Sequence, residues 1–252
     1  MFSKIAVMKL RNIIFSLGTL LFPMRCPGCN TVMPGSDPST RLCETCQNSI
    51  ALLSGVYCSV CGRRLSETVR HPHSNHILFP ATDFKTTAIR NCIHALKYRR
   101  ERLVARICAE LLFLYLKKIE RSYDLSFGKW LLIPIPLHPR RARERGFNQS
   151  ELIAKELLSC YSKAKQPAPS FSASLLARTA YAPAQVRSKT RKARQKNLEG
   201  MFAVRDAMEL KNQDILLLDD VSTTGTTLHE ASAALLRAGA RRVFALVVAK
   251  VF

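Results

Sequence analysis

The stretch that most constrains the fold is residues 214–231, DILLLDDVSTTGTTLHEA. It begins with a nearly continuous apolar run that ends in two aspartates, as a parallel β-strand covered on both faces requires. A short loop rich in hydroxyl residues follows, and then apolar residues at helical spacing. After Trp130 the chain keeps alternating strand-like segments, such as WLLIPIP and VFALVVAKV, with helix-like ones. This pattern predicts an α/β fold in which helices flank a parallel sheet.

The loop between this strand and helix suits a phosphate group. Backbone N–H groups and the positive end of the helix dipole converge there, and Gly225 lets a phosphate approach the backbone closely. The Gly-Lys-Ser/Thr signature of a P-loop is absent. Two carboxylates would repel a phosphate unless they face another part of the ligand, for which sugar hydroxyls, or a magnesium ion bridging to them, are natural partners. The predicted site residues are Asp219, Asp220, Ser222, Thr223, Thr224, Gly225, Thr226 and Thr227.

Six of the nine cysteines form three Cys-x-x-Cys pairs. Two thiols this close chelate a metal better than they form a stable disulfide, which indicates reduced cysteines and a cytoplasmic protein. The first two pairs begin 17 residues apart. That spacing predicts two knuckles that hold one tetrahedral zinc ion, a structural site because four thiolates leave no open position. The predicted ligands are Cys26, Cys29, Cys43 and Cys46.

The third pair, Cys58 and Cys61, needs two further ligands, and the nearby candidates lie in HPHSNH. His73 and His76 have the spacing of a knuckle, with His71 as a spare, so they predict a second zinc site. Alternatively, the histidines are solvated loop residues and the third pair binds no metal or joins the first site. The pairing of the knuckles stays open, since the first and third pairs could also interleave.

The composition suggests three parts. Residues 26–80 are rich in Cys, Pro, Gly and Ser and lack the apolar periodicity of a core, which predicts a zinc-ribbon module, single or double, in which metal replaces the core. Residues 81–252 carry the α/β pattern. Residues 1–25 contain the apolar run IIFSLGTLLFP, which is too short to span a bilayer. We expect an amphipathic helix that packs on the body, with contact to a membrane surface as the alternative.

The chain has 39 Lys and Arg against 18 Asp and Glu, a formal net charge of +21, which predicts a polyanionic partner. The charge is concentrated in runs at residues 97–102, 140–145 and 187–196. The third run indicates binding to a nucleic-acid backbone, without base-specific reading because aromatic residues are sparse there. Simple surface solubility is the alternative. The candidate residues of this run are Arg187, Lys189, Arg191, Lys192, Arg194 and Lys196.

The segment LLLDDVSTTGTTL resembles the 5-phosphoribosyl-1-pyrophosphate (PRPP) motif of type I phosphoribosyltransferases. The resemblance implies that the catalytic acids Asp219 and Asp220 contact the ribose 2′ and 3′ hydroxyls and that the loop wraps the 5′-phosphate. It also implies that Arg140 and Arg141, in LHPRR, neutralise a leaving pyrophosphate together with magnesium. Purine-salvage members carry an aspartate as general base where this chain has Thr223, which disfavours a 6-oxopurine substrate.

Further segments narrow the resemblance. IPIPLHPRRARERGFNQSELIAKEL, HALKY and RQKNLEGMF, behind paired cysteine knuckles, are similar to the ComF family of competence-associated proteins, from about Phe22 to Phe252. The resemblance implies a cytoplasmic protein without a membrane span that handles single-stranded DNA during natural transformation, with competence or recombination proteins as partners. The chain departs from the family pattern in HPHSNH, where members commonly have a fourth Cys-x-x-Cys. It also lacks the usual leucine after the glutamine of QVRSKTRKARQKN.

Three functional hypotheses follow. The first is a ComF-like phosphoribosyltransferase with bound zinc and magnesium, whose acceptor the sequence does not identify. The second is a non-catalytic DNA-binding protein that senses PRPP or a nucleotide in the same pocket. The third is a phosphoribosyltransferase of nucleotide metabolism. No residue stands out as a general base for an acceptor, which weighs against catalysis.

Overall fold

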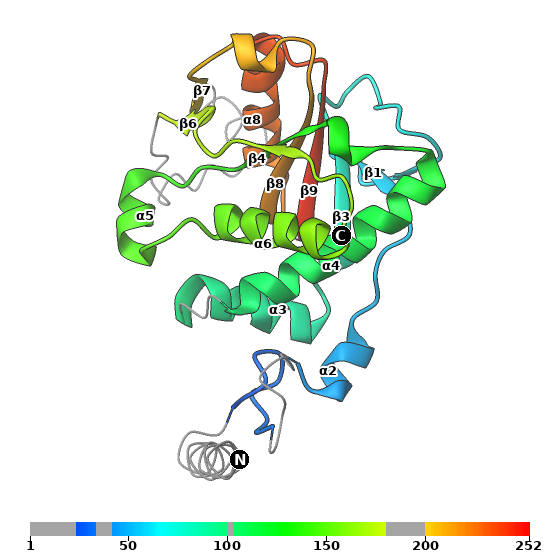
Figure 1. The fold of residues 1–252 in the computed structure, drawn as a ribbon, viewed down its shortest axis with the longest axis vertical. Coiled ribbons are helices and arrows are strands. Elements are labelled where there is room, and N and C mark those ends of the chain that lie inside the picture. Colours follow the sequence, from blue (N-terminus) through cyan, green and yellow to red (C-terminus); the bar gives the residue numbers. More distant parts are fainter. Residues whose placement is uncertain (1–23, 34–41, 100–102, 180–199) are drawn as a thin grey trace, which may run out of the picture.

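The computed structural model describes residues 24–33, 42–99, 103–179 and 200–252, and Figure 1 shows their arrangement. The elements in chain order are α2 (Glu44–Ser49), β1 (Val56–Cys58), β2 (Arg64–Leu65), β3 (Ile77–Asp83), α3 (Thr87–His94), the π-helical turn η1 (Ala95–Arg99), α4 (Leu103–Tyr123), the 3₁₀ turn η2 (Phe127–Lys129), β4 (Leu131–Pro134), α5 (Pro139–Arg145), α6 (Gln149–Lys163), β5 (Ser170–Phe171), β6 (Leu176–Arg178), β7 (Phe202–Val204), the 3₁₀ turn η3 (Met208–Leu210), β8 (Asp214–Ser222), α8 (Thr226–Arg237) and β9 (Arg242–Lys250).

A seven-stranded sheet in the order β2-β1-β3-β9-β8-β4-β5 forms the centre of the molecule. The strands β3, β9, β8, β4 and β5, in their order across the sheet, pair in parallel. Strands β1 and β2 add an antiparallel hairpin beside β3. Strand β8 lies between β9 and β4, and its first five residues are buried. The predicted parallel sheet and α/β class are confirmed. A separate two-stranded sheet, β6 with β7, lies outside this sheet.

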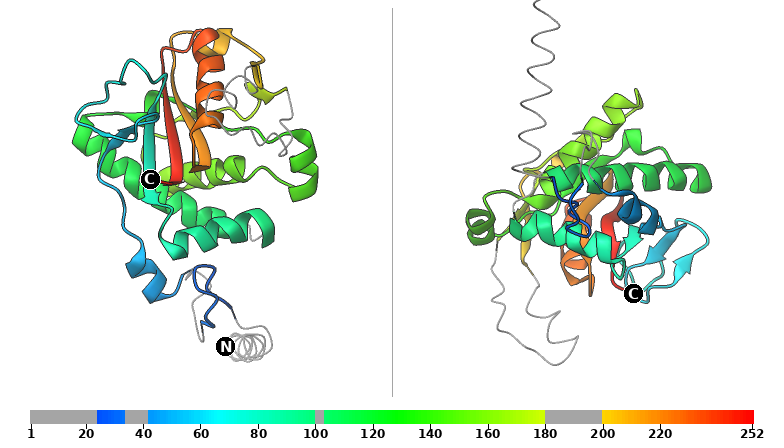
Figure 2. Two further views of the ribbon diagram at one scale, coloured as in Figure 1. Left: turned by 180° about the vertical axis from the view of Figure 1, so that it is seen from behind. Right: turned by 90° about the horizontal axis from the view of Figure 1, so that it is seen from below.

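Two apolar layers cover the faces of the sheet. Helices α3, α4 and α6 pack on one face, where Leu216 and Leu218 of β8 contribute to the core. Helix α8 packs on the other face, where Ile215 and Leu217 lie. The layers are seen in the right-hand view of Figure 2, with α4 and α6 on one side of the strands and α8 on the other. Alternate residues of one strand therefore serve opposite cores, which explains why β8 is apolar throughout.

Several helix boundaries follow from local sequence signals. Asn148 caps α6, since its side-chain Oδ1 accepts a hydrogen bond from the Ser150 N–H at 3.1 Å. The π-helical turn η1 lies between α3 and α4 in the chain. Helix α8 ends just before Gly239, whose φ of 102° is in the left-handed region typical of a helix C-terminus.

The N-terminal part of the chain consists of two segments, one away from the main sheet and one paired with it. Residues 24–33 and α2 lie beyond α3, away from the strands (Figure 1). The hairpin β1–β2, by contrast, is hydrogen-bonded to the central sheet through β3. The predicted boundary at residue 80 falls within β3, and the three-part division stays a prediction, with most of segment 1–25 outside the described residues. Among the helices described, none is both long and apolar enough to cross a membrane.

Candidate functional site

The candidate site lies where the central parallel strands end. Strands β4 and β8 run side by side, and the Ile135 N–H donates to the Leu218 carbonyl at 2.8 Å where β4 stops. Asp219 and Asp220 follow immediately on β8. Ligands of open α/β sheets bind beyond the carboxyl ends of the strands, where loops can meet them without disturbing the core. The two predicted acids therefore occupy the position on the sheet at which a ligand site is expected.

Asp219 is partly buried and is held by a residue of a second motif. Its Oδ1 accepts hydrogen bonds from the Ser150 hydroxyl at 2.9 Å and from the Asp220 N–H at 2.8 Å. Burial, and next the adjacent charge of Asp220, raise the pKa of Asp219 to about 7, while the hydrogen bonds and Lys97 oppose the shift. Ser150 belongs to RGFNQS, so two segments far apart in sequence converge on one carboxyl group.

Asp220 is 3% exposed and pairs with Lys97, whose Nζ lies 2.8 Å from Asp220 Oδ1. The other carboxylate oxygen, Oδ2, is buried and has no hydrogen-bond partner among the described residues. Lys97 comes from HALKY and lies on the π-helical turn η1, a rare backbone form that occurs frequently at functional sites. The charge pattern places Lys97 only within a basic run, whereas its position within HALKY is the signal that could identify it as a site residue.

The predicted phosphate loop, residues 222–227, leads from β8 into α8. Gly225 is the N-cap of α8 and has φ of 73°, a conformation that glycine adopts without strain. The Thr224 and Thr226 hydroxyls lie 2.8 Å apart, and the first N–H groups of an α-helix have no acceptor within the helix. Ser222 is buried, whereas Thr223 and Thr224 are exposed. The loop thus presents backbone and hydroxyl donors to solvent at the positive end of a 12-residue helix.

The predicted pyrophosphate residues Arg140 and Arg141 lie on α5, which follows β4. Arg140 is exposed, and its Nε donates to Glu144 Oε1 at 3.0 Å. Arg178, on β6, is a further arginine that the sequence analysis did not single out. Burial, and next the charge of Arg141, lower the pKa of Arg178, while Asp219 raises it. Arg178 therefore lies close enough to both residues to interact electrostatically, and its Nε is buried without a hydrogen-bond partner in the described chain.

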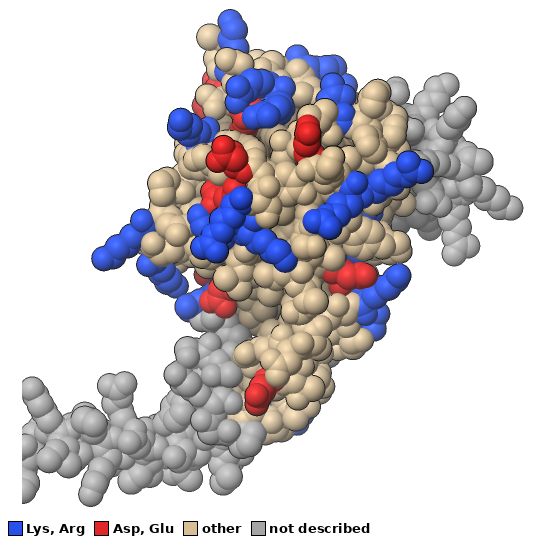
Figure 3. Space-filling view, turned by 90° about the vertical axis from the view of Figure 1, so that its right-hand side faces the viewer, with Lys and Arg blue, Asp and Glu red and all other residues tan. Residues whose placement is uncertain are grey.

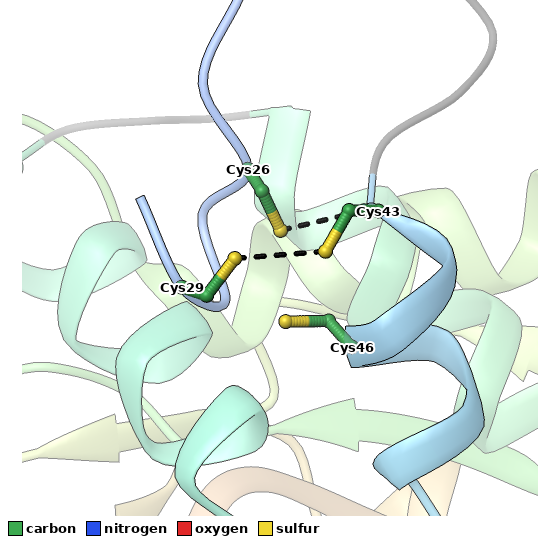
Figure 4. A group of neighbouring side chains, drawn as sticks. All are labelled: Cys26, Cys29, Cys43 and Cys46. Atoms are coloured by element: carbon green, nitrogen blue, oxygen red, sulfur yellow. Dashed lines mark hydrogen bonds between the residues drawn. The ribbon is translucent and has the colours of Figure 1, made fainter. Parts of the chain in front are cut away.

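Four cysteines form a compact group, which we call the first cluster: Cys26, Cys29, Cys43 and Cys46. Their sulfur atoms lie within 4.8 Å of one another, and Figure 4 shows them pointing toward one another from the turn after Met24 and the start of α2. Four soft thiolate donors at this spacing fit a tetrahedral zinc ion and leave no position for water. The predicted first ligand set is brought together in full.

A second cluster contains Cys58, Cys61, His71 and His73, again with ligand atoms within 4.8 Å of one another. Cys58 Sγ lies 3.3 Å from His73 Nε2, and Cys61 Sγ lies 3.5 Å from His71 Nδ1. This Cys2His2 donor set also fits zinc. His71, considered only a spare, takes the place predicted for His76. His76 directly precedes the buried strand β3 and is itself buried, so it lies apart from the cluster.

A cavity of about 640 Å³, open to solvent, joins the second cluster to the phosphate loop. One side consists of residues near the second cluster, and the other side consists of the loop and the first turn of α8. The residues that matter below are Ser59, His73, His76, Thr224, Gly225 and His229.

The basic residues are distributed over more than one part of the surface. On the face shown in Figure 3, Lys and Arg side chains are spread out, with Asp and Glu among them. Lys97, from the first run, is directed to Asp220, and Arg145, from the second, lies 5.8 Å from the centre of the Tyr98 ring. The third run, residues 187–196, falls outside the described residues.

Two family models match the chain. Residues 17–76 match a double zinc ribbon domain, and residues 151–251 match a phosphoribosyl transferase domain. The double zinc ribbon and the four-cysteine group together support a structural zinc ion. Among solved structures, the hypoxanthine-guanine phosphoribosyl transferase of L. donovani aligns with a TM-score of 0.34 and 14% identity, covering 58% of this chain and 67% of that chain.

Three curated relatives span most of the chain. Competence protein F of Haemophilus influenzae is 29% identical over 80% of this chain and 87% of its own length. Competence protein ComFC of Bacillus subtilis is 26% identical over 80% of both chains. The DNA utilization protein YhgH of Escherichia coli K12 is 27% identical over 80% of this chain and 93% of its own. The zinc-ribbon match covers the part of the chain that holds both metal clusters, and the phosphoribosyl transferase match covers β8 and the candidate site. The chain is therefore a homologue of the ComF, ComFC and YhgH proteins, with a double zinc ribbon and a phosphoribosyl transferase domain.

Proposed function

We propose that the protein binds PRPP, with magnesium, at the carboxyl end of β8 and acts there as a phosphoribosyltransferase. The observation that carries the proposal is the convergence of three separate motifs on one pair of acids. Ser150 of RGFNQS holds Asp219, Lys97 of HALKY holds Asp220, and the phosphate loop begins two residues further on. A ligand that carries both hydroxyls and a phosphate fits this arrangement, because the acids accept hydrogen bonds and the loop donates them.

Each group has a role that its chemistry allows. The loop amides would bind the 5′-phosphate, and the carboxylates would accept from the ribose hydroxyls and favour positive charge that develops on the ribose during transfer. Asp220 Oδ2 is a buried acceptor with no hydrogen-bond partner in the described chain, and a ribose hydroxyl would supply the missing donor. Magnesium, when bound with PRPP, would share the charge of the leaving pyrophosphate. Arg140 and Arg141 would neutralise the rest from α5.

The rival hypothesis is a sensor that binds PRPP but does not turn it over. We would incubate the zinc-loaded protein with PRPP, magnesium and candidate acceptors and measure pyrophosphate release. A transferase releases pyrophosphate, and Asp220→Asn abolishes the release. Asp124→Asn is the matched control, because Asp124 is exposed at the end of α4, far along the chain from the motifs above. PRPP binding without release under any acceptor supports the sensor, and absence of PRPP binding refutes both.

We also propose that the protein handles single-stranded DNA. This rests on the net charge of +21 and on the printed names of its relatives, which refer to competence and DNA utilization. The test compares single-stranded DNA binding at increasing salt for two triple variants of equal charge change. We expect Arg187→Gln with Lys189→Gln and Arg191→Gln to weaken binding and its salt dependence. Lys118→Gln with Arg121→Gln and Lys129→Gln, three exposed residues near the end of α4, should change neither. Equal behaviour of the two variants would contradict a specific role for residues 187–196.

A further inference from the structure

The cavity between the second cluster and the phosphate loop has two walls of different origin. Ser59 lies between the ligands Cys58 and Cys61, and His73 is itself a ligand. The opposite wall is Thr224, Gly225 and the first turn of α8. No part of the first cluster lines this cavity. The second cluster therefore borders the candidate ligand site, whereas the first cluster does not.

The contact between these walls is close at Gly225. A Cβ atom on this residue would lie 3.4 Å from the Ser59 carbonyl oxygen, in van der Waals contact with it. The φ of 73° already favours glycine here. The knuckle that carries Cys58 and Cys61 thus packs directly against the backbone of the phosphate loop, at the residue that caps α8.

Hydrogen bonds tie the two halves of the second cluster together behind this contact. The Ser59 and Ser74 hydroxyls lie 2.5 Å apart, and Ser74 donates to the His76 carbonyl at 2.6 Å. Ser74 and His76 are 2% and 1% exposed. A metal ion in the second cluster would hold the segments of residues 58–61 and 71–73 at the geometry in which these bonds form.

A further bond joins the second cluster to α8. Asn75 Nδ2 donates to the His229 carbonyl at 2.8 Å, which leaves Asn75 Oδ1 as the acceptor 2.7 Å from His76 Nδ1. His76 Nδ1 must then carry the proton, and Nε2 is an acceptor. That Nε2 is buried and has no hydrogen-bond partner among the described residues, and the His76 residue borders the cavity. The cavity is thus bordered by the hydroxyl-rich loop at the start of α8 and by a histidine tied to α8 through Asn75, a combination that suits a phosphate ester bearing hydroxyl groups.

We propose that the second cluster, when it holds its metal ion, forms one wall of the phosphate-ester site, so that binding of the phosphorylated ligand depends on metal in the second cluster and not on metal in the first. The proposal rests on the proposed function, because it requires that the phosphate loop binds a phosphorylated sugar. Loss of the metal frees the knuckle that packs on Gly225 and the segment that binds α8. The loop then pays more ordering entropy when the ligand binds.

Coupling of this kind is reciprocal. If metal in the second cluster raises the affinity for the ligand by some factor, the ligand raises the affinity for that metal by the same factor, and known couplings are roughly 5- to 150-fold. Ribose 5-phosphate is the probe, because it carries the phosphate and the hydroxyls without the pyrophosphate and its magnesium. Binding is measured by calorimetry, and zinc content by mass spectrometry.

The variants are matched between the clusters. Cys61→Ser with His71→Asn removes two ligands of the second cluster while retaining the buried Cys58. Cys29→Ser with Cys43→Ser removes two ligands of the first cluster while retaining its buried cysteines. Each double variant should bind one zinc ion fewer than the wild type. We expect the second-cluster variant to bind ribose 5-phosphate at least about fivefold more weakly and the first-cluster variant to bind it as the wild type does.

Asn75→Ala addresses misfolding, because it removes the bond to α8 without removing a metal ligand. It should retain both zinc ions and still weaken ribose 5-phosphate binding, and in the wild type the ligand should slow zinc loss to a chelator from the second cluster alone. Unchanged affinity after verified loss of the second zinc, an equal loss of affinity in both cluster variants, or a wild type that binds only one zinc ion would each overturn the proposal. A wild type that does not bind ribose 5-phosphate would refute the proposed function as well, which separates the two failures.

Discussion

The first and second clusters share the Cys-x-x-Cys spacing but are embedded in the molecule in different ways. The first is built from the turn after Met24 and the start of α2, and one of its links to the body is the Asn91 side chain, which donates to the Gly28 carbonyl at 2.7 Å. The second lies at the hairpin β1–β2, which is part of the central sheet, and it borders the phosphate loop. A shared Cys-x-x-Cys pair therefore does not fix the surroundings of a cluster: the first lies away from the strands, and the second borders the candidate ligand site.

The largest difference should appear when metal is removed. Structural zinc contributes on the order of 10 kcal/mol to the folding of a small module. With a chelator, we expect amide hydrogen exchange to rise throughout residues 24–33 and 42–50, while β8 and β9 stay protected. The hairpin β1–β2 should lose less protection, because its pairing with β3 remains. If both regions lose protection to the same extent, the second cluster is no better supported by the body than the first.

Acidification should act on Asp219 and on the first cluster with opposite sign. The folded-state pKa of Asp219, about 7, lies above its unfolded value of about 3.9. The folded state therefore binds more protons than the unfolded state between these values, and the contribution of Asp219 to the free energy of unfolding falls as pH rises from about 4 to about 7, by at most about 1.4 kcal/mol per pH unit. Zinc-bound cysteines must be deprotonated, so the first cluster loses its metal as pH falls.

Denaturation of Asp219→Asn checks this difference. The variant should lack the decline between pH 4 and 7 and be more stable than the wild type near pH 8, with zinc release from the first cluster unchanged. A wild type whose stability does not depend on Asp219 over this window would show that the carboxyl group is ionised throughout.

Two glycine substitutions should have effects of intermediate size, one on the zinc affinity of the first cluster and one on ligand binding beside the second. Gly28→Ala places a Cβ 2.8 Å from Cys46 Sγ, so it should lower the zinc affinity of the first cluster. Gly225→Ala forces alanine to φ of 73° at a cost of about 1–2 kcal/mol and places a methyl group beside the Ser59 carbonyl. It should weaken ribose 5-phosphate binding and leave the first cluster intact. Zinc competition measures the first effect, and calorimetry measures the second. Weaker ribose 5-phosphate binding in Gly28→Ala, or weaker zinc binding to the first cluster in Gly225→Ala, would contradict the separation of the two regions.

The smallest effects should come from the anchors of the two regions. Tyr115 of α4 is fully buried and donates to the Gly55 carbonyl at 2.6 Å, just before β1. Tyr115→Phe removes this bond and should lower the free energy of unfolding of the whole sheet by about 1 kcal/mol, measured by urea denaturation. Asn91→Ala removes the bond to Gly28 and should raise hydrogen exchange only in residues 24–33. A global loss of stability in Asn91→Ala would show that the first region folds together with the body.

Much of the molecule could be predicted from local patterns. The continuous apolar run at residues 215–218 predicts a doubly covered parallel strand, and Asn148 predicts the start of α6, because apolar patterning and helix capping are local features of the sequence. The paired acids next to a hydroxyl-rich loop indicated a sugar phosphate, and Cys26, Cys29, Cys43 and Cys46 indicated zinc. These conclusions needed only spacing and residue chemistry.

What the sequence could not specify depends on which segments meet in space. The Lys97–Asp220 pair, the approach of Arg178 to Asp219, and the replacement of His76 by His71 all join residues through tertiary packing. His76 has the right spacing for a ligand, but burial beside β3 takes it away from the cluster. The hairpin β1–β2 joined the sheet because β3 offered an edge, and only that pairing placed the second cluster against the phosphate loop. Spacing along the chain therefore determined which residues could bind a metal or a phosphate, and strand pairing decided which of these sites became neighbours.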